Sequence, residues 1–187
     1  MKVVIGLGNP TQKHTADRHN SGFHVLDMLA GEKNIFFEEK SAFYCLLASS
    51  KDMLFAKPTT WMNDSGLCAK ALFKQYGVLP VVIYDDIDIT LGEVKCSFGR
   101  GAGGHNGVQS IIDHLGTKDF FRIRVGVRPV HDELKDAILP PKGFETFLLK
   151  PFAPFEKDLK EQGIKRAVAV LSALETKSFD EVMNEFN

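Results

Sequence analysis

The chain has 187 residues, of which 44% are hydrophobic and 25% charged, and its 23 Lys and Arg nearly balance its 24 Asp and Glu. These values are ordinary for a soluble globular protein, and the length predicts a single domain over residues 1–187 with a full core. A net charge of −1 gives no global reason to expect nucleic-acid binding, so any such partner must be held by a local patch.

The N-terminus, the cysteines and the apolar runs predict a cytoplasmic protein. The first residues run straight into Gly6 and lack the longer apolar core of a signal peptide. Cys45, Cys68 and Cys96 are odd in number, scattered and without a C-x-x-C pairing, which favours a reducing compartment. No apolar run approaches the roughly 20 residues of a membrane helix, so we expect no membrane partner.

Strand and helix patterns alternate along the chain. In order, we expect a strand at 3–7, a turn at 8–10, a helix at 20–29, a hairpin of strands at 43–49 and 53–57, a helix capped by Asn63 or Asp64 and stopped by Gly77, and strands at 81–85 and 93–98. Then follow a glycine-rich loop, a helix ending at Gly116, a strand at 121–128, a long loop at 129–144 expected to be mobile, a helix at 156–174, and a short helix opened by a capping box at Ser178. This order predicts an α/β fold, a single-domain three-layer sandwich whose twisted, mixed and mostly parallel sheet is flanked by helices.

The strand predicted at 121–128 has the cleanest two-residue alternation in the chain. Its apolar positions face one side of the sheet, and its three arginines, Arg122, Arg124 and Arg128, face the other. An arginine face of this kind is either a solvated surface or a phosphate-binding one.

The stretch from Gly101 to Gly107 contains four glycines together with His105 and Asn106. Glycine allows positive φ and lets other groups approach the backbone closely. A helical pattern starts directly afterwards, so the loop offers N–H groups and the positive end of a helix dipole to an anion or oxyanion. A loop with a purely structural histidine explains the pattern equally well.

Polar side chains follow several predicted strands, where the sites of α/β sheets usually collect. They are Asn9 and Arg18-His19-Asn20 after the first strand, Asn63 with Trp61 and Met62 after the hairpin, Asp85, Asp86 and Asp88 after the strand at 81–85, and Arg100, His105 and Asn106 after the strand at 93–98. This set supplies a histidine base, a carboxylate to orient it, and amides to hold a carbonyl group or a water molecule.

Hydrolysis of an activated acyl bond fits that set of side chains. A neutral imidazole can deprotonate water near pH 7, and a carboxylate on its other nitrogen fixes the tautomer. No G-x-S-x-G nucleophile motif is present and no cysteine has an activating context, so direct attack by water is the preferred mechanism.

Other interpretations stay open at this point. His19, His105 and the three aspartates could bind a metal ion, although neither H-E-x-x-H nor zinc-type spacing is present. Gly6-x-Gly8 suggests a dinucleotide site, but Thr11 replaces the third glycine of that motif. The aspartates could also be helix caps or solvated strand ends, and His19 a buried, satisfied side chain.

Taken together, the motifs resemble the bacterial peptidyl-tRNA hydrolase family over essentially the whole chain. They are Gly6-Leu7-Gly8-Asn9-Pro10, Arg18-His19-Asn20-Ser21-Gly22, Lys57-Pro58-Thr59-Thr60-Trp61-Met62-Asn63, Asp85-Asp86-Ile87-Asp88, Gly103-Gly104-His105-Asn106-Gly107, Arg122-Ile123-Arg124-Val125-Gly126 and Phe147-Leu148-Leu149. Each motif is weak alone, but their common order is highly specific.

The resemblance implies a monomeric cytoplasmic enzyme that hydrolyses the ester between a peptide and the terminal ribose of tRNA, without a metal or organic cofactor. By position, His19 matches the family's catalytic base and Asp85 the acidic partner that orients it. The other matched positions bind substrate, namely the amides Asn9, Asn63 and Asn106 and the cleft-lining Met62 and His105. The family pattern, and not the spacing, selects Asp85 over Asp86 and Asp88.

The tRNA is expected to bind a local basic segment, because residues 95–128 hold six cationic against two acidic side chains. Lys95 and Arg124 match family positions that hold a phosphate of the acceptor stem. Ser97 replaces a second lysine, for which Arg100 is expected to compensate. His14 replaces a tyrosine near the base and is retained as a substrate contact, and Thr11 replaces a glycine.

Two alternatives of another class remain. One is an RNA-binding protein on the same scaffold that has lost turnover, although every residue that the chemistry needs is retained. The other is a hydrolase of a different acyl ester, which would not need the basic segment.

Overall fold

The protein is described by a computed structural model that covers residues 1–130 and 144–187. Seven strands form one sheet in the order β2-β3-β4-β1-β5-β7-β6. The strands are β1 Lys2–Gly6, β2 Glu38–Lys40, β3 Cys45–Ser50, β4 Met53–Pro58, β5 Val81–Thr90, β6 Val94–Phe98 and β7 Phe121–Arg128. The four central strands, β4-β1-β5-β7, run parallel, whereas β2, β3 and β6 join antiparallel at the edges. The predicted mixed sheet with a mostly parallel centre is confirmed.

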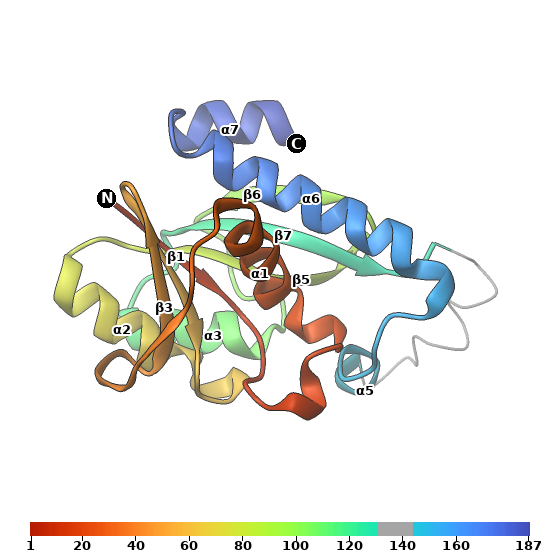
Figure 1. Ribbon diagram of the computed structural model, residues 1–187, viewed down its shortest axis with the longest axis horizontal. Coiled ribbons are helices and arrows are strands. Elements are labelled where there is room, and N and C mark those ends of the chain that lie inside the picture. The colour runs from red at the N-terminus through yellow and green to blue at the C-terminus, as the bar shows by residue number, and fades with distance from the viewer. Residues whose placement is uncertain (131–143) are drawn as a thin grey trace.

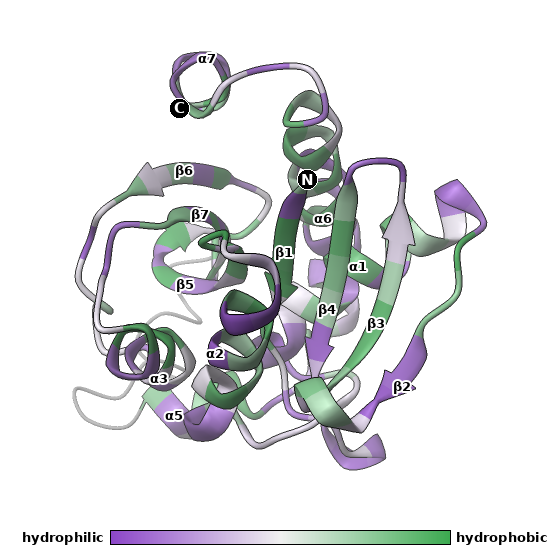
Figure 2. Cartoon of the chain, turned by 90° about the vertical axis from the view of Figure 1, so that its left-hand side faces the viewer, coloured by the Kyte–Doolittle hydropathy of each residue, from purple (hydrophilic) through white to green (hydrophobic). Residues whose placement is uncertain are grey.

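Helices cover both faces of the sheet (Figure 1). They are α1 Ser21–Lys33, α2 Ser65–Tyr76, α3 Asn106–Leu115, α5 Phe144–Leu148, α6 Lys157–Ala173 and α7 Phe179–Phe186. On β1, Val4 packs into the core shared with α1 and α6, while Val3 and Ile5 pack into the core shared with α2 and α3. Strands covered by helices on both faces are accordingly apolar. Figure 2 shows that the central strands β1 and β4 are mostly hydrophobic, whereas the edge strand β2 is hydrophilic. The predicted three-layer sandwich is therefore confirmed.

The ends of several helices carry the capping residues that the sequence predicts. Gly77 and Gly116 end α2 and α3 at φ of 69° and 70°, a left-handed conformation that glycine adopts without strain. Ser178 and Glu181 form the predicted capping box of α7. Asp64 occupies the predicted N-cap position of α2, but its side chain makes no capping hydrogen bond, and a 3₁₀ turn, Met62–Asp64, leads into the helix.

Other predictions need correction. The strand predicted at 81–85 continues to Thr90, so the acidic residues lie on β5 and not beyond it. The helix predicted at 20–29 begins at Ser21, after a 3₁₀ turn Arg18–Asn20, and continues to Lys33. Strand β2 and helix α5 were not predicted, because three exposed residues and five residues are too short for a periodic pattern. The mobility expected of the loop at 129–144 falls on 131–143, which lie outside the described residues.

The arginine side of β7 is not a solvated face. Arg122 is completely buried and Arg124 is only 8% exposed. The guanidinium of Arg122 donates to the carbonyl oxygens of Gly101 and Arg100 and lies 4.5 Å from the ring centroid of Phe120. Arg122 therefore holds the start of the glycine-rich loop against the sheet.

Within the described residues, no helix is both long and apolar enough to span a membrane.

Gly22, at the start of α1, sets the distance between this helix and the sheet. A Cβ atom built there would overlap the backbone of Leu7 and the carbonyl oxygen of Ile83. Only a residue without a side chain lets α1 come this close to the sheet. The turn that carries His19 directly precedes α1, so its position depends on the same contact.

We expect Gly22→Ala to lower the free energy of unfolding by about 1–3 kcal/mol, because the new methyl group has no space and the backbone must shift. Urea denaturation measures this change. Gly31→Ala is the matched control, since nothing lies within 4 Å of its Cβ position on the same helix and alanine favours helix by roughly 0.5–1 kcal/mol. A Gly22→Ala protein as stable as wild type would contradict the packing argument.

Candidate active site

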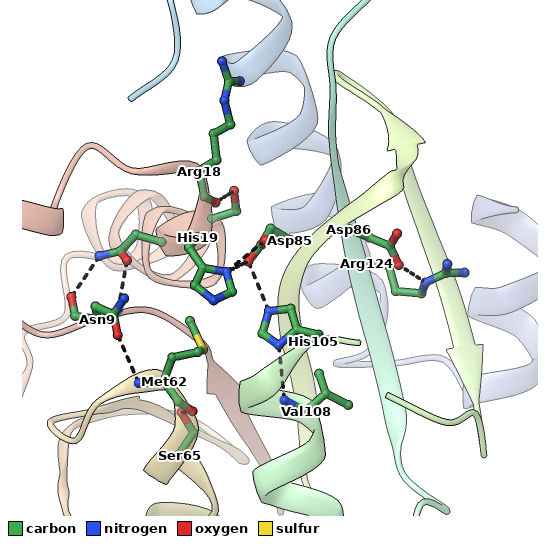
Figure 3. A network of polar contacts seen from close by, with 12 residues as sticks. Asn9, Arg18, His19, Met62, Ser65, Asp85, Asp86, His105, Val108 and Arg124 are labelled. Atoms are coloured by element: carbon green, nitrogen blue, oxygen red, sulfur yellow. Dashed lines mark hydrogen bonds and ion pairs between the residues drawn. The ribbon is translucent and has the colours of Figure 1, made fainter. Parts of the chain in front are cut away.

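The side chains of His19, Asp85 and His105 meet at the end of the central strands (Figure 3). His19 lies in the turn between β1 and α1, Asp85 on β5, and His105 directly before α3. His19 Nδ1 lies 2.9 and 3.0 Å from the two carboxylate oxygens of Asp85, and His105 Nε2 lies 3.2 Å from Asp85 Oδ1. All three residues are buried. One carboxylate therefore accepts from two imidazoles that come from different parts of the sequence.

The hydrogen-bond network assigns the tautomer of each ring. His105 caps α3, because its Nδ1 accepts the backbone N–H of Val108 at 3.2 Å. The proton of a neutral His105 is therefore on Nε2, from which it is donated to Asp85. His19 donates from Nδ1 to the same carboxylate, which leaves the lone pair of its Nε2 free to accept a proton.

The charge of Asp85 strengthens His19 as a base. Burial alone would lower the pKa of His19, but the charge and the hydrogen bond of Asp85 outweigh burial and raise this pKa above the ordinary value. Burial alone would raise the pKa of Asp85, but the two facing histidines hold it well below the usual carboxyl range. Asp85 is therefore ionised throughout the working pH range.

The same three residues have the composition of a metal site, and their ligating atoms lie within 4.8 Å of one another. The donor set does not fit a metal ion, because the cap on α3 keeps a proton, and not a lone pair, on His105 Nε2. Asp86 does not join this cluster, since its Oδ2 accepts from Arg124 Nε at 2.8 Å and its Oδ1 accepts the N–H of Asp88.

Asn9 is held with its amide in one orientation. Its Oδ1 accepts the backbone N–H of Met62 at 3.0 Å, and its backbone N–H and C=O both bond to the side chain of Asn20. Because the side-chain oxygen is engaged, the NH₂ group of Asn9 remains as a donor. Figure 3 shows Asn9 between Met62 and the turn of His19.

A pocket of about 770 Å³ opens over these groups. The sequence-predicted residues that line it are Asn9, His19, Met62, Asn63, His105 and Asn106. His14 does not line the pocket, but its ring makes an edge contact with Trp61, which does, and its Nδ1 lies 2.6 Å from Asp17 Oδ2. The structure thus brings together six of the predicted pocket residues. It places His14 next to Trp61 but outside the pocket lining.

Helix α5 supplies a wall of the pocket that sequence reasoning missed. Phe144, Glu145, Leu148 and Leu149 line it from this side. The motif at 147–149 was noted, but five residues carry too little periodicity to indicate which side chains face a site.

Arg18 ties the turn of His19 to the C-terminal part of the chain. Its guanidinium makes two bonds, of 3.2 and 2.6 Å, to the buried Glu156 and stacks on the rings of Phe147 and Phe152. Paired in this way, a buried arginine is a rigid clamp. The position of Arg18 after the first strand predicts that it lies near the site, but the sequence alone does not identify its distant partner Glu156.

The basic residues predicted to bind RNA lie beside β6 and β7. Lys95 on β6 is exposed and pairs in register with Arg124 on β7. Arg100 and Arg124 line a second cavity of about 150 Å³ next to Asp85 and His105. Because Arg122 is buried and Asp86 pairs with Arg124, less positive charge is accessible than the residue count over 95–128 suggests.

Comparison with known proteins gives one consistent result. The family model described as Peptidyl-tRNA hydrolase matches residues 3–187. Proteins of that name from Thermodesulfovibrio yellowstonii and Bacillus subtilis are 37% and 39% identical to the chain, covering 100% of it and 99% and 98% of their own lengths. A crystal structure of a peptidyl-tRNA hydrolase variant from Acinetobacter baumannii superimposes with a TM-score of 0.88 at 25% identity, covering 100% of this chain and 94% of that one.

We expect Asp85→Asn to lower the pKa of His19. The substitution removes the charge that raises this pKa and leaves the burial that lowers it. NMR titration of the histidine ring protons measures the shift. Asp86→Asn is the matched control, since Asp86 contacts Arg124 and not His19. An equal effect of both substitutions would contradict the assigned network.

Proposed function

The chain belongs to the peptidyl-tRNA hydrolase family, and from that premise we propose how its pocket carries out the reaction. The enzyme hydrolyses the ester bond between the peptide and the tRNA of peptidyl-tRNA and releases both. The observation that carries the proposed mechanism is the free Nε2 of His19, whose other ring nitrogen is held by the buried, ionised Asp85.

His19 acts as the general base in this proposal. Its Nε2 takes a proton from a water molecule, whose oxygen attacks the ester carbonyl and forms a tetrahedral intermediate. Asp85 stabilises the imidazolium that results. When the carbon–oxygen bond to the ribose breaks, the imidazolium returns the proton to the departing ribose oxygen. Base catalysis of this kind contributes about 10²–10⁴-fold to the rate.

The amides of Asn9, Asn63 and Asn106 hold the substrate around this base. Asn9 presents a fixed NH₂ donor, and the other two line the same pocket from the segments before α2 and at the start of α3. A fixed donor aimed at the oxyanion contributes on the order of 10²–10³-fold. Met62 and His105 complete the lining.

These amides also explain how the enzyme distinguishes its substrate from aminoacyl-tRNA. A peptidyl ester carries an amide next to its α-carbon, whereas an aminoacyl ester carries an ammonium group there. Asparagine side chains pair with the amide and would compensate an ammonium poorly. Because such a site reads the main chain, we expect N-acylated aminoacyl-tRNA to be cleaved and free aminoacyl-tRNA largely spared.

The tRNA is bound by the basic residues outside the pocket. Lys95, Arg100 and Arg124 lie where phosphate contacts can supply affinity without reading sequence. We propose further that His14 contacts substrate beside Trp61, whose ring it touches. We also propose that the chain forms a single domain over residues 1–187 and acts as a monomer in the cytoplasm.

We expect His19→Ala to lower kcat by at least about 10²-fold while tRNA binding is retained. The assay measures labelled acyl-amino acid released from N-acylated aminoacyl-tRNA in the presence of EDTA, with free aminoacyl-tRNA as the comparison substrate. Wild-type activity should fall on acidification through a pH above about 6.5, because the raised pKa of His19 keeps the base protonated below it. Tight tRNA binding without ester cleavage by the wild type would contradict hydrolysis.

We expect Lys95→Ala to raise KM for tRNA esters several-fold and to make binding less dependent on salt, while a minimal ester without the acceptor stem is unaffected. Steady-state kinetics over a range of salt concentrations measure both effects. Lys74→Ala is the control, because it removes an exposed lysine from α2, away from β6. Equal losses on the tRNA ester and the minimal ester would argue against a phosphate contact.

A further inference from the structure

One wall of the pocket carries an unexplained charge. Among the described residues that line the pocket, Glu145 of α5 is the only acidic or permanently cationic side chain. The others are amides, imidazoles, glycine and apolar groups. Glu145 is exposed to solvent on its wall of the pocket.

Helix α5 separates this negative charge from the basic residues. Phe144 and Leu148 border both the large pocket and the smaller cavity, whereas Glu145 borders only the large pocket. Arg100 and Arg124 border only the smaller cavity. Since a carboxylate repels phosphate and the arginines attract it, Glu145 belongs to the side that holds the peptide.

The charge of Glu145 also reaches the reacting group. The acidic groups that act on His19 are Asp85 from β5, Asp17 from the preceding turn and Glu145 from α5, and each raises the pKa of His19. The neighbouring His105 ring is already committed to Asp85 and to the cap of α3. Glu145 therefore adds negative charge to the pocket that His19 also lines.

We propose that Glu145 makes the enzyme favour peptidyl-tRNA whose esterified residue has a cationic side chain. The inference rests on the proposed function, because it assumes that the ester lies beside His19. A lysine side chain at that position would extend along the wall formed by α5, to which Glu145 belongs. Its aliphatic stem would pack on Trp61 and Leu149, and its ammonium group would pair with the carboxylate.

The decisive experiment compares two substrates that differ only at the side-chain nitrogen, which is charged in one and acetylated in the other. Nα-acetyl-lysyl-tRNA keeps the side-chain ammonium, and Nα,Nε-diacetyl-lysyl-tRNA lacks it. For the wild type we expect kcat/KM to be roughly fivefold higher for the monoacetyl substrate, as for a partly screened ion pair. Glu145→Gln should bring this ratio close to one, and Glu145→Lys should invert it. Glu32→Gln, which removes an exposed carboxylate of α1 outside the pocket, should keep the wild-type ratio.

The substrate ratio separates charge recognition from a structural role. Glu145 lies in the first turn of α5, where an acidic residue also stabilises a helix, but loss of that stabilisation would affect both substrates equally. A second readout is the acid limb of the pH profile, which should move to lower pH in Glu145→Gln because the charge that raises the pKa of His19 is lost. An unchanged ratio in Glu145→Gln would overturn the proposal. Failure of the wild type to cleave either substrate would overturn the proposed function, and the inference with it.

Discussion

The site depends on one buried carboxylate, that of Asp85. A buried negative charge is tolerated only when it is paired and hydrogen-bonded, and Asp85 satisfies this need with two imidazoles. The two imidazoles stabilise the carboxylate, and the carboxylate in turn fixes the tautomers of His19 and His105 by accepting their protons. His105 in turn caps α3 and so joins the glycine-rich loop to the same network. Base strength, loop position and helix start therefore follow from a single electrostatic constraint.

Packing brings these groups to the carboxylate from distant parts of the sequence. The missing side chain of Gly22 lets α1 approach the backbone of Leu7 and Ile83, which sets the turn of His19 over the end of β5. On β7, the Arg122 guanidinium donates to the carbonyl oxygens of Gly101 and Arg100 and so holds the loop that leads to His105. Buried residues outside the pocket, such as Gly22 and Arg122, thus position the groups that line it.

Sequence reasoning predicted the elements better than the environments of their side chains. The strand at 121–128 has the predicted bounds, yet its arginine side is buried, because alternation distinguishes two faces without showing what covers them. Spacing alone did not separate Asp85 from Asp86, since both lie on β5 and only their partners, histidine for one and Arg124 for the other, tell them apart. Glu145 could not be assigned to the pocket, because α5 is too short for a pattern. The use of a histidine ring as a helix cap lies outside the usual set of capping residues.

The clamp between Arg18 and Glu156 has a consequence for how the enzyme is made. Its two residues are 138 positions apart, so the contact cannot form until most of the polypeptide has left the ribosome. Until then a guanidinium destined for the interior has no counter-charge, and the turn that bears His19 is not locked. We therefore expect the growing chain to gain its catalytic geometry only after Glu156 has emerged. An enzyme that cleaves peptides from tRNA would thus lack its active geometry while the segment up to Glu156 is still being added to a peptide on tRNA.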